Sequence, residues 1–295
     1  MKSGERLGKI FNRFHLRFVL NPWIRFKSDR LGNYAGANLL QREVPLIVTL
    51  TSYEERFDML EIAIYSLLKQ TIKPDRLVLY LSDEFENTSN LPYGITKYIK
   101  NGLEIRFVKD IRSYTKSVYA MKEFQTGIIV TADDDIYYPK DWLEKLYMSY
   151  ISSPKDIHVH QAQRVKLKDG EILPYKMWDK SVEEETARFD NYITGSGGVL
   201  YPPACFSREV FREDIFLKYS PFSDDLWFWV MSLISGRKIR VVKNHIRSLY
   251  CTDPKAVIGL VSKRSLYAIN KRGENDKQLK NLLKLYGQNI NNRLK

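Results

Sequence analysis

Hydrophobic and polar positions change period repeatedly along the middle of the chain, and these changes predict strands and helices in turn. Short apolar runs rich in β-branched residues predict buried strands, whereas apolar residues at every third or fourth position predict helices. The predicted strands cover residues 45–52, 76–82, 104–108, 128–131 and, later, 238–242. The predicted helices cover residues 57–68, 95–100 (ended by Gly102), 118–124 and 142–150. The strand–helix alternation implies an α/β fold with a doubly wound, mostly parallel sheet, which binds ligands at the carboxyl ends of its strands.

Positive charge is concentrated at the two ends of the chain. The 295 residues carry a formal net charge of +12. Residues 1–30 hold eight Lys/Arg against two Asp/Glu, and residues 271–295 hold seven against two, so these ends contribute +6 and +5. The body is therefore close to neutral, whereas a nucleic-acid enzyme more often carries its positive charge on a working face of the body. The polar composition of the C-terminal segment predicts a solvated helix with a frayed tail.

The N-terminal segment combines basic and aromatic residues at helical spacing. The basic set is Arg6, Lys9, Arg13 and Arg17, and the apolar set on a neighbouring face is Leu7, Phe11, Phe14 and Phe18, continued by Trp23 and Phe26. One interpretation is a helix that lies in the interface of an anionic membrane, and the other is an arm packed against the domain.

Three sequence features predict a cytoplasmic protein. No run reaches the roughly 18 apolar residues of a membrane span. No apolar signal-peptide core follows the basic N-terminus. Cys205 and Cys251 lack metal-ligand spacing and suit two buried free thiols in a reducing compartment. On the membrane-interface interpretation of the N-terminal segment, the protein would be held at the inner face of the cell membrane.

Three consecutive aspartates, Asp133, Asp134 and Asp135, follow the predicted strand 128–131. Adjacent carboxylates repel each other and raise each other's pKa, so placing three at the end of a buried strand is costly. A divalent cation would relieve this cost, since Mg²⁺ and Mn²⁺ take oxygen ligands and share them with substrate phosphates. The alternative is a solvated acidic turn that caps the helix beginning near Pro139.

Polar residues also follow the first and second predicted strands. They are Thr51, Ser52, Tyr53, Glu54, Glu55 and Arg56 after the first strand, and Ser82, Asp83 and Glu84 after the second. Any one of them could be a helix cap. All, however, would lie with the aspartates at the edge of the sheet formed by the carboxyl ends of its strands, called the rim below. Neither a G-x-G-x-x-G nor a Walker A sequence is present. The rim is therefore a candidate ligand site of another kind.

Three ordered segments carry a resemblance to a known family. They are V-P-L-I-V-T-L-T-S-Y from Val44, S-L-L-K-Q-T-I-K-P-D-R-L-V-L-Y-L-S-D from Ser66, and T-A-D-D-D-I-Y-Y-P-K-D-W-L from Thr131. Residues 44–150 resemble the nucleotide-sugar-binding half of GT-A-fold glycosyltransferases, in particular family-2-like enzymes of bacterial capsule and lipooligosaccharide synthesis. The resemblance is thinner to about residue 250. It implies a GT-A domain over residues 44–250, with 151–250 as its acceptor half, a basic N-terminal segment 1–43 and a basic helical tail 251–295.

The resemblance implies roles for the residues of the rim. The aspartates, as a DxD motif, would hold Mn²⁺ or Mg²⁺ against the donor diphosphate. Asp133 and Asp135 have the D-x-D spacing, whereas counting back from Pro139 puts Asp134 at the family's metal position. Asp83 matches the base-binding aspartate, whose carboxylate can accept the imide N–H of uracil, which favours a UDP-sugar. Thr51, Ser52 and Glu54 would line the nucleoside pocket, and Lys116 either pairs with phosphate or is an exposed lysine at a helix start.

The second half holds candidate residues for the donor sugar, the acceptor and the metal. Gly195-Ser196-Gly197-Gly198 is either a ligand-approach segment, with Gly197 and Gly198 under the donor sugar, or an ordinary tight turn. Asp224 and Asp225 open a helix, where an acid is either a cap or, in inverting GT-A enzymes, the general base. At most one of Trp227 and Trp229 would stack on a sugar. His245 is either a third metal ligand or a surface residue, and His158 and His160 are interpreted as structural.

These observations predict a metal-dependent glycosyltransferase that moves a sugar from a nucleotide-sugar donor to a saccharide or lipid-linked saccharide acceptor, with inversion. Two alternatives belong to other classes. A sugar nucleotidyltransferase would be expected to carry a glycine- and basic-rich loop after its first strand, where this chain has Ser52-Tyr53-Glu54-Glu55-Arg56. A non-catalytic nucleic-acid-binding protein would explain the charge of +12 but not the acidic rim. We therefore expect no nucleic-acid partner.

Overall fold

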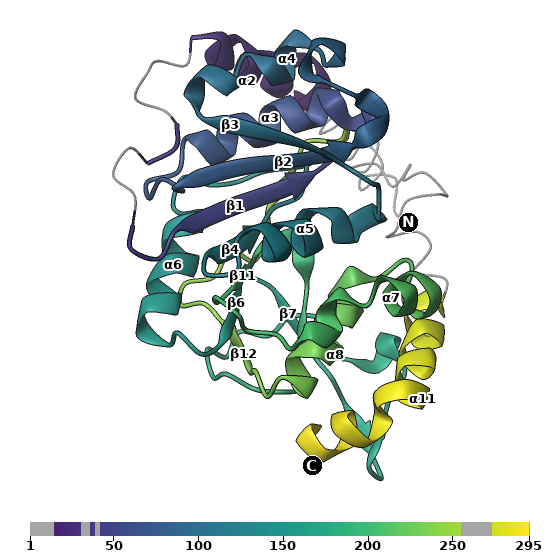
Figure 1. The fold of residues 1–295 in the computed structure, drawn as a ribbon. Coiled ribbons are helices and arrows are strands. Elements are labelled where there is room, and N and C mark those ends of the chain that lie inside the picture. The colour runs from purple at the N-terminus through teal and green to yellow at the C-terminus, as the bar shows by residue number, and fades with distance from the viewer. Residues whose placement is uncertain (1–14, 31–35, 39–41, 255–272, 295) are drawn as a thin grey trace, which may run out of the picture.

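A twisted seven-stranded sheet forms the centre of the protein (Figure 1). The computed structural model describes residues 15–30, 36–38, 42–254 and 273–294. The sheet order is β12-β6-β11-β4-β1-β2-β3, and every neighbouring pair is parallel except those made by β11, which runs antiparallel to β4 and β6. The strands are β1 Leu46–Thr51, β2 Arg76–Ser82, β3 Leu103–Val108, β4 Ile128–Thr131, β6 Ile157–Val159, β11 Val199–Tyr201 and β12 Ile239–Val241. The mostly parallel sheet confirms the predicted fold class.

Helices cover both faces of the sheet, because its strands alternate buried side chains between the two faces. Leu46, Val48 and Leu50 of β1 belong to a core shared with α3, α4 and α6, whereas Ile47 belongs to a core shared with α5 and α8. The helices are α2 Asn21–Asp29, α3 Phe57–Leu68, α4 Tyr93–Thr96, α5 Thr115–Glu123, α6 Trp142–Ser152, α7 Glu213–Tyr219, α8 Asp224–Ile234 and α11 Asn275–Leu294. The short strands are β5 Ile136–Tyr137, β7 Ala162–Arg164, β8 Leu167–Lys168, β9 Glu171–Ile172, β10 Asn191–Ile193 and β13 Tyr250–Cys251.

The predicted strands and the long predicted helices are confirmed, with ends that shift by a few residues. The helix predicted over 95–100 is broken into α4 and a 3₁₀ turn, Ile99–Asn101. The turn ends at Gly102, whose φ of 92° lies in the left-handed region that favours glycine. The predicted position of the helix end is therefore right, although the helix itself is short.

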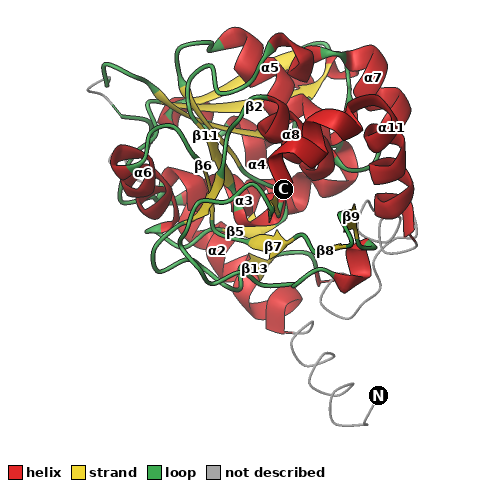
Figure 2. Ribbon diagram, turned by 90° about the horizontal axis from the view of Figure 1, so that it is seen from below, coloured by secondary structure: helices red, strands yellow, loops and turns green. Residues whose placement is uncertain are grey.

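The C-terminal helix is not the solvated element that its composition predicts. α11 packs against α8 and α7 (Figure 2) and buries Leu279, Leu282 and Ile290. These three apolar residues lie on one face at helical spacing, and that pattern outweighs the polar composition of the rest. The segment is therefore part of the body of the protein as far as Leu294.

The structure corrects one expectation about a single residue, the burial of Cys251, and resolves another, the position of the two tryptophans. Trp227 and Trp229 both belong to the core, with 0% exposure, so neither is placed to stack on a sugar. Of the cysteines, Cys205 is buried but Cys251 is half-buried. The basic N-terminal residues Arg6, Lys9 and Arg13 lie outside the described part of the chain. His158 and His160 are fully buried and hydrogen-bonded, which fits the predicted structural role, and burial lowers the pKa of each to about 4.

Candidate active site

The three aspartates lie at the carboxyl end of β4, as predicted, but residues of the β1 loop already neutralise part of their charge. Asp134 is only 6% exposed and accepts a hydrogen bond from the Ser52 hydroxyl at 2.6 Å. Nη1 of Arg56 lies 2.8 Å from Asp134 Oδ1 and 2.9 Å from Asp135 Oδ2. β1 and β4 are adjacent parallel strands, so their carboxyl ends bring this loop and the aspartates together. The cluster is therefore an ion-paired acidic site rather than a solvated turn.

A lysine neutralises the remaining aspartate from the other side. Lys116 lies in the first turn of α5, is 8% exposed, and forms an ion pair with Asp133. Burial by itself would lower the pKa of Lys116, but the charges of Asp133 and Asp224 raise it above the usual lysine value. The interpretation as an exposed helix-start lysine is therefore wrong. The amine remains charged and links the β4 cluster electrostatically to the acids of α8.

The aspartates keep a surplus of negative charge despite these partners. Burial raises the pKa of Asp134 above its usual value, and the favourable charge of Arg56 only partly offsets this. Burial likewise raises the pKa of Asp135 to about 7. Because three carboxylates face only two cations, the site still favours a further positive charge or a proton.

The two acids at the start of α8 have different surroundings. Ser223 precedes the helix, and neither acid serves as its N-cap. Both carboxylate oxygens of Asp225 accept from the backbone N–H of Gly195, at 3.1 and 3.0 Å. Burial, and secondarily the charge of Asp224, raise the pKa of Asp225 to about 8. Asp225 is therefore a carboxylate with high proton affinity, fixed to the glycine-rich turn.

The glycine-rich turn is shaped by close contacts with protein groups. A Cβ at Gly195 would lie 2.5 Å from Asp225 Oδ1, and one at Gly198 would lie 2.3 Å from the ring of Trp142. Gly198 also has a φ of 89°. The indole N–H of Trp142 donates to the carbonyl of Gly197 at 2.8 Å. Packing therefore explains two of the glycines, and the predicted contact of Gly197 and Gly198 with a donor sugar stays a prediction.

The remaining predicted residues make no hydrogen bond or ion pair with the aspartates, Lys116 or Asp225. Glu54 and Asp83 are exposed on the rim, while the hydroxyl of Thr51 donates into the sheet, to the carbonyl of Tyr80 at 2.9 Å. His245 is half-buried, and its Nε2 is buried without a hydrogen-bond partner. Among the described residues, no three His, Cys, Asp or Glu side chains meet as a metal site would require. The structure therefore joins Ser52, Lys116, the aspartates and Asp225, but not His245.

Sequence reasoning gave no role to Arg56, which contacts two of the three aspartates. It also missed Tyr138, whose hydroxyl accepts from the backbone N–H of Asp133 at 2.7 Å, and Trp142. The sequence did contain an indication for Arg56. Arg56 is the one basic residue in the polar loop 51–56, which follows the first strand and shares the rim with the three aspartates.

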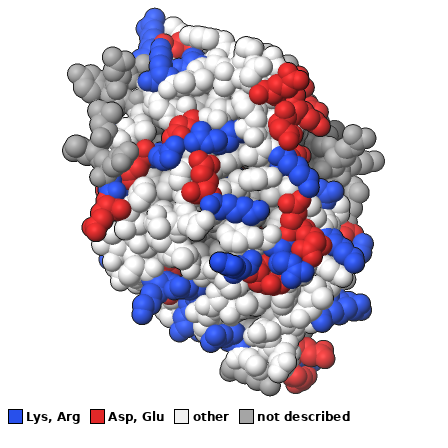
Figure 3. All heavy atoms as spheres, in the orientation of Figure 1, with Lys and Arg blue, Asp and Glu red and all other residues white. Residues whose placement is uncertain are grey.

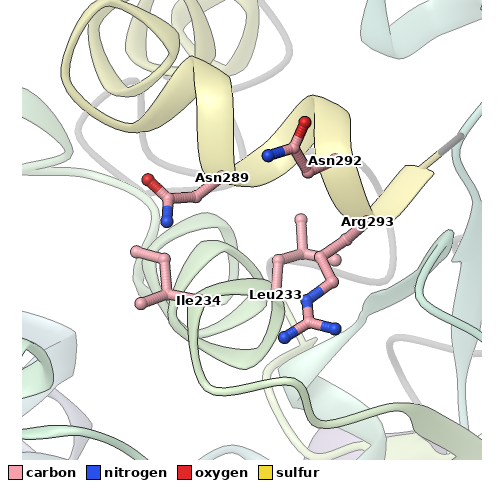
Figure 4. Close-up of a pocket in the computed structure, with 5 residues that line it drawn as sticks. All are labelled: Leu233, Ile234, Asn289, Asn292 and Arg293. Atoms are coloured by element: carbon pink, nitrogen blue, oxygen red, sulfur yellow. The ribbon is translucent and has the colours of Figure 1, made fainter.

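A separate cleft lies away from these residues. It has a volume of about 230 Å³ and lies between α8 and α11, lined by Leu233, Ile234, Asn289, Asn292 and Arg293 (Figure 4). Leu233 is eight residues beyond Asp225 on α8, which is roughly 12 Å along a helix. The cleft therefore does not open onto the candidate active site.

The chain belongs to the glycosyl transferase family 2, because the model of that family matches residues 47–215, more than half of the sequence. Among curated proteins, none matches it. The family assignment favours a glycosyltransferase over a sugar nucleotidyltransferase or a non-catalytic nucleic-acid-binding protein. On the face seen in Figure 3, acidic and basic side chains are also interleaved.

Several solved structures are similar in fold. GalNAc-T7 with UDP, GalNAc and Mn²⁺ is 14% identical, with a TM-score of 0.45 over 74% of this chain and 48% of that one. This chain thus spans about half the length of that structure. TarS 1–349 of S. aureus is 17% identical, with a TM-score of 0.47 over 82% and 72% of the two chains. CMP:2-keto-3-deoxy-manno-octonic acid synthetase with CTP is 10% identical, with a TM-score of 0.44 over 78% and 100%.

Proposed function

We propose that the protein is a metal-dependent, inverting glycosyltransferase that moves a sugar from a nucleotide-sugar donor to a saccharide or lipid-linked saccharide acceptor. The acceptor would be an intermediate in bacterial surface glycan synthesis. The observation that carries the proposal is the connected set of charges from Asp133–Asp135 through Lys116 to Asp224 and Asp225. It supports the proposal because the carboxylates that would take a cation and a diphosphate interact through Lys116 with a carboxylate of high proton affinity. These are the two parts that an inverting transfer needs.

The donor side of the site fits a hard divalent ion. All three candidate ligands offer carboxylate oxygen, which Mg²⁺ and Mn²⁺ prefer. No described residue makes a hydrogen bond to Oδ2 of Asp133 or Oδ1 of Asp135. Asp133, Asp134 and Asp135 would hold the ion after their side chains turn from Lys116 and Arg56 to converge on it, and His245, with its unpartnered Nε2, would join only if its loop moved. When bound, the ion would neutralise the leaving diphosphate as a Lewis acid.

The residues of the first two strand ends would bind the nucleoside. Asp83 is exposed at the end of β2, where its carboxylate could accept the imide N–H of uracil, so we favour a UDP-sugar. Ser52 and Glu54 would line the same pocket, while Thr51 would contribute through its backbone because its hydroxyl is bound within the sheet. Lys116 would hold the diphosphate electrostatically, and Gly197 and Gly198 would lie under the sugar.

Asp225 would act as the general base that deprotonates the acceptor hydroxyl. A base works best when its pKa is close to the working pH, and burial raises the pKa of Asp225 to about 8. Asp224 contributes because its charge is the second cause of that shift. The N–H of Gly195 would orient the carboxylate, so that one oxygen faces the acceptor.

The test of this function is donor hydrolysis across UDP-, GDP-, CMP- and dTDP-sugars, with Mn²⁺ and with EDTA. We expect slow release of nucleoside diphosphate from one UDP-sugar, and its loss in EDTA. Equal release in EDTA would contradict the metal role alone. No release from any donor, with no thermal shift from any nucleotide plus Mn²⁺, would contradict the donor site as a whole.

We also propose a peripheral contact with an anionic membrane, made by the outer face of α2 and the residues just before it. Phe18, Val19, Trp23 and Phe26 are each 50–58% exposed there. Val19, Trp23 and Phe26 recur at helical spacing, and aromatic residues of this kind favour the lipid–water interface. The amine of Lys27 lies 4.0 Å from the ring centroid of Trp23, and the guanidinium of Arg30 lies 4.1 Å from that of Phe26. Basic groups beside exposed rings complement anionic headgroups.

The opposite face of α2 is held firmly, so the aromatic face has a fixed orientation. Ile24 is buried, and the buried amine of Lys97 binds Ser28 at 2.9 Å and Asp29 and Glu61 at 2.6 Å each. α2 packs against α3 in this way at the edge of the molecule (Figure 1). None of the helices in the described residues is long and apolar enough to cross a membrane.

Co-sedimentation with vesicles tests the membrane contact. We expect binding to vesicles that contain phosphatidylglycerol, and at least tenfold weaker binding for the double variant Trp23→Ser/Phe26→Ser, because burial of one large apolar side chain contributes about 1.5–3 kcal/mol. The matched control is Met148→Ser/Ile151→Ser, which removes two exposed apolar side chains from α6. Equal binding by both double variants would contradict the assignment to α2.

A further inference from the structure

Arg56 supplies positive charge directly beside two of the three aspartates. A single atom, Nη1, contacts both Asp134 and Asp135, and Nε donates to the Tyr53 hydroxyl at 2.9 Å. An arginine guanidinium stays charged throughout the pH range in which proteins are folded. The guanidinium is thus a permanent counter-ion that the fold holds against the cluster.

We propose that Arg56 is a built-in competitor for the divalent metal, and that it makes binding of the metal depend on the nucleotide diphosphate. This inference rests on the proposed function, because it concerns the same metal and donor. A fixed positive charge that contacts two candidate ligands repels an incoming dication and uses lone pairs that the dication needs. The free protein would therefore bind Mn²⁺ weakly. Few protein molecules would therefore hold the metal without the nucleotide diphosphate.

The diphosphate would offset the repulsion between Arg56 and the dication. It adds negative charge to the site. It also offers an acceptor to Nη2 of Arg56, which makes no hydrogen bond to any described residue, since the bonds of Arg56 come from Nε and Nη1. Guanidinium groups bind phosphate oxygens through parallel N–H donors. Metal and diphosphate would therefore bind cooperatively, and linkage requires each to raise the affinity of the other by the same factor. Arg56 would be a positioning residue that sets the size of this factor.

Binding of Mn²⁺, measured as the loss of the electron paramagnetic resonance signal of free Mn²⁺, tests the inference without any turnover. The variant is Arg56→Gln, measured with and without UDP. We expect at least tenfold tighter binding of Mn²⁺ alone than in the wild type, since tenfold corresponds to only about 1.4 kcal/mol. UDP should then raise the Mn²⁺ affinity by a smaller factor than it does in the wild type. Arg56→Lys keeps the charge but not the parallel N–H donors, so its binding of Mn²⁺ alone should stay close to that of the wild type, while UDP should raise its Mn²⁺ affinity by a smaller factor.

The matched control is Arg76→Gln. Arg76 also pairs with a carboxylate, that of Glu104, but at the opposite end of β2 from the rim, so its loss should leave Mn²⁺ binding unchanged. Equal or weaker Mn²⁺ binding by Arg56→Gln, while the wild type binds Mn²⁺ with UDP, would overturn the inference and leave the proposed function standing. No Mn²⁺ binding by either protein, with UDP present, would overturn both. If Arg56→Gln is unfolded in metal-free buffer, Mn²⁺ should restore its circular dichroism, and a failure to do so would also overturn the inference.

Discussion

Replacing Asp225 by Asn is expected to lower kcat for transfer to the acceptor by about 10³-fold, the loss typical of a general base. Asn keeps the volume of the side chain and an oxygen that can accept from Gly195 N–H, but it cannot take a proton from the acceptor. The acceptor-independent hydrolysis of the donor should fall less, because water is not positioned as the acceptor is. Rates of transfer and of hydrolysis, measured on the same protein, separate the two effects.

The pH dependence of the same pair of proteins adds a second measurement. The base must be deprotonated to act, so kcat/KM of the wild type should rise with pH along a limb with an apparent pKa near 8. Stability should change in the opposite sense. Between about pH 4, the pKa of aspartate in an unfolded chain, and about pH 8, the folded protein holds a proton that the unfolded chain has released. The wild type therefore loses stability as pH rises through this window, and Asp225→Asn should lose less, because the raised pKa values of Asp134 and Asp135 still act in the same direction.

The control for Asp225 is Asp214→Asn. Asp214 also lies in the first turn of a helix, α7, but pairs with Arg212 on the surface. Its replacement should change neither transfer nor the pH profile. Transfer by Asp225→Asn at near the wild-type rate would remove Asp225 as the base and direct attention to Asp224.

The sheet could be predicted because its strands and helices differ sharply in period. Ile128–Thr131 has to be a buried strand, since four apolar or β-branched residues bounded by Gly127 cannot form an amphipathic helix. The helix predicted over 95–100 extends beyond the observed α4. The segment Tyr93–Asn101 is too short to form a stable helix by propensity, so contacts with α3 decide its conformation. The packing of α11 could not be predicted because its apolar stripe is narrow within a polar composition, and only the tertiary structure shows that α8 and α7 cover that stripe.

The positions of the site residues could be predicted, but not their partners. Ser52 and Asp134 each follow the carboxyl end of a parallel strand, so the topology of the sheet alone places them on the same rim. Whether Lys116 faces solvent or Asp133, however, depends on the orientation of α5 about its own axis against the sheet. The sequence alone does not fix that orientation. The hydrogen bond between Asp225 and Gly195 is equally hard to predict, since it joins residues 30 apart through a backbone N–H that every residue type except proline offers.

Replacing Asp134 by Asn is expected to abolish metal-dependent turnover of the donor, with a fall of at least 10³-fold, or about 4 kcal/mol of transition-state stabilisation. Asp134 is the most buried of the three aspartates and the one held on both sides, by Ser52 and Arg56. Loss of its charge removes a ligand and also leaves Arg56 paired with Asp135 alone. Donor hydrolysis over a range of Mn²⁺ concentrations, with Mn²⁺ binding measured in parallel, checks this.

The fold should tolerate the change, which makes the activity loss interpretable. Asn keeps an oxygen to accept from Ser52 or Arg56, and burial has already raised the pKa of Asp134, so its charge costs the folded state free energy. We therefore expect a Tm at or above that of the wild type, while Asp141→Asn, in a half-buried ion pair with Lys145, serves as the control. Turnover near the wild-type rate at any Mn²⁺ concentration would contradict the role of Asp134. Because Asp134→Asn should weaken Mn²⁺ binding and Arg56→Gln should strengthen it, opposite shifts from the two halves of one ion pair would separate a metal ligand from its competitor.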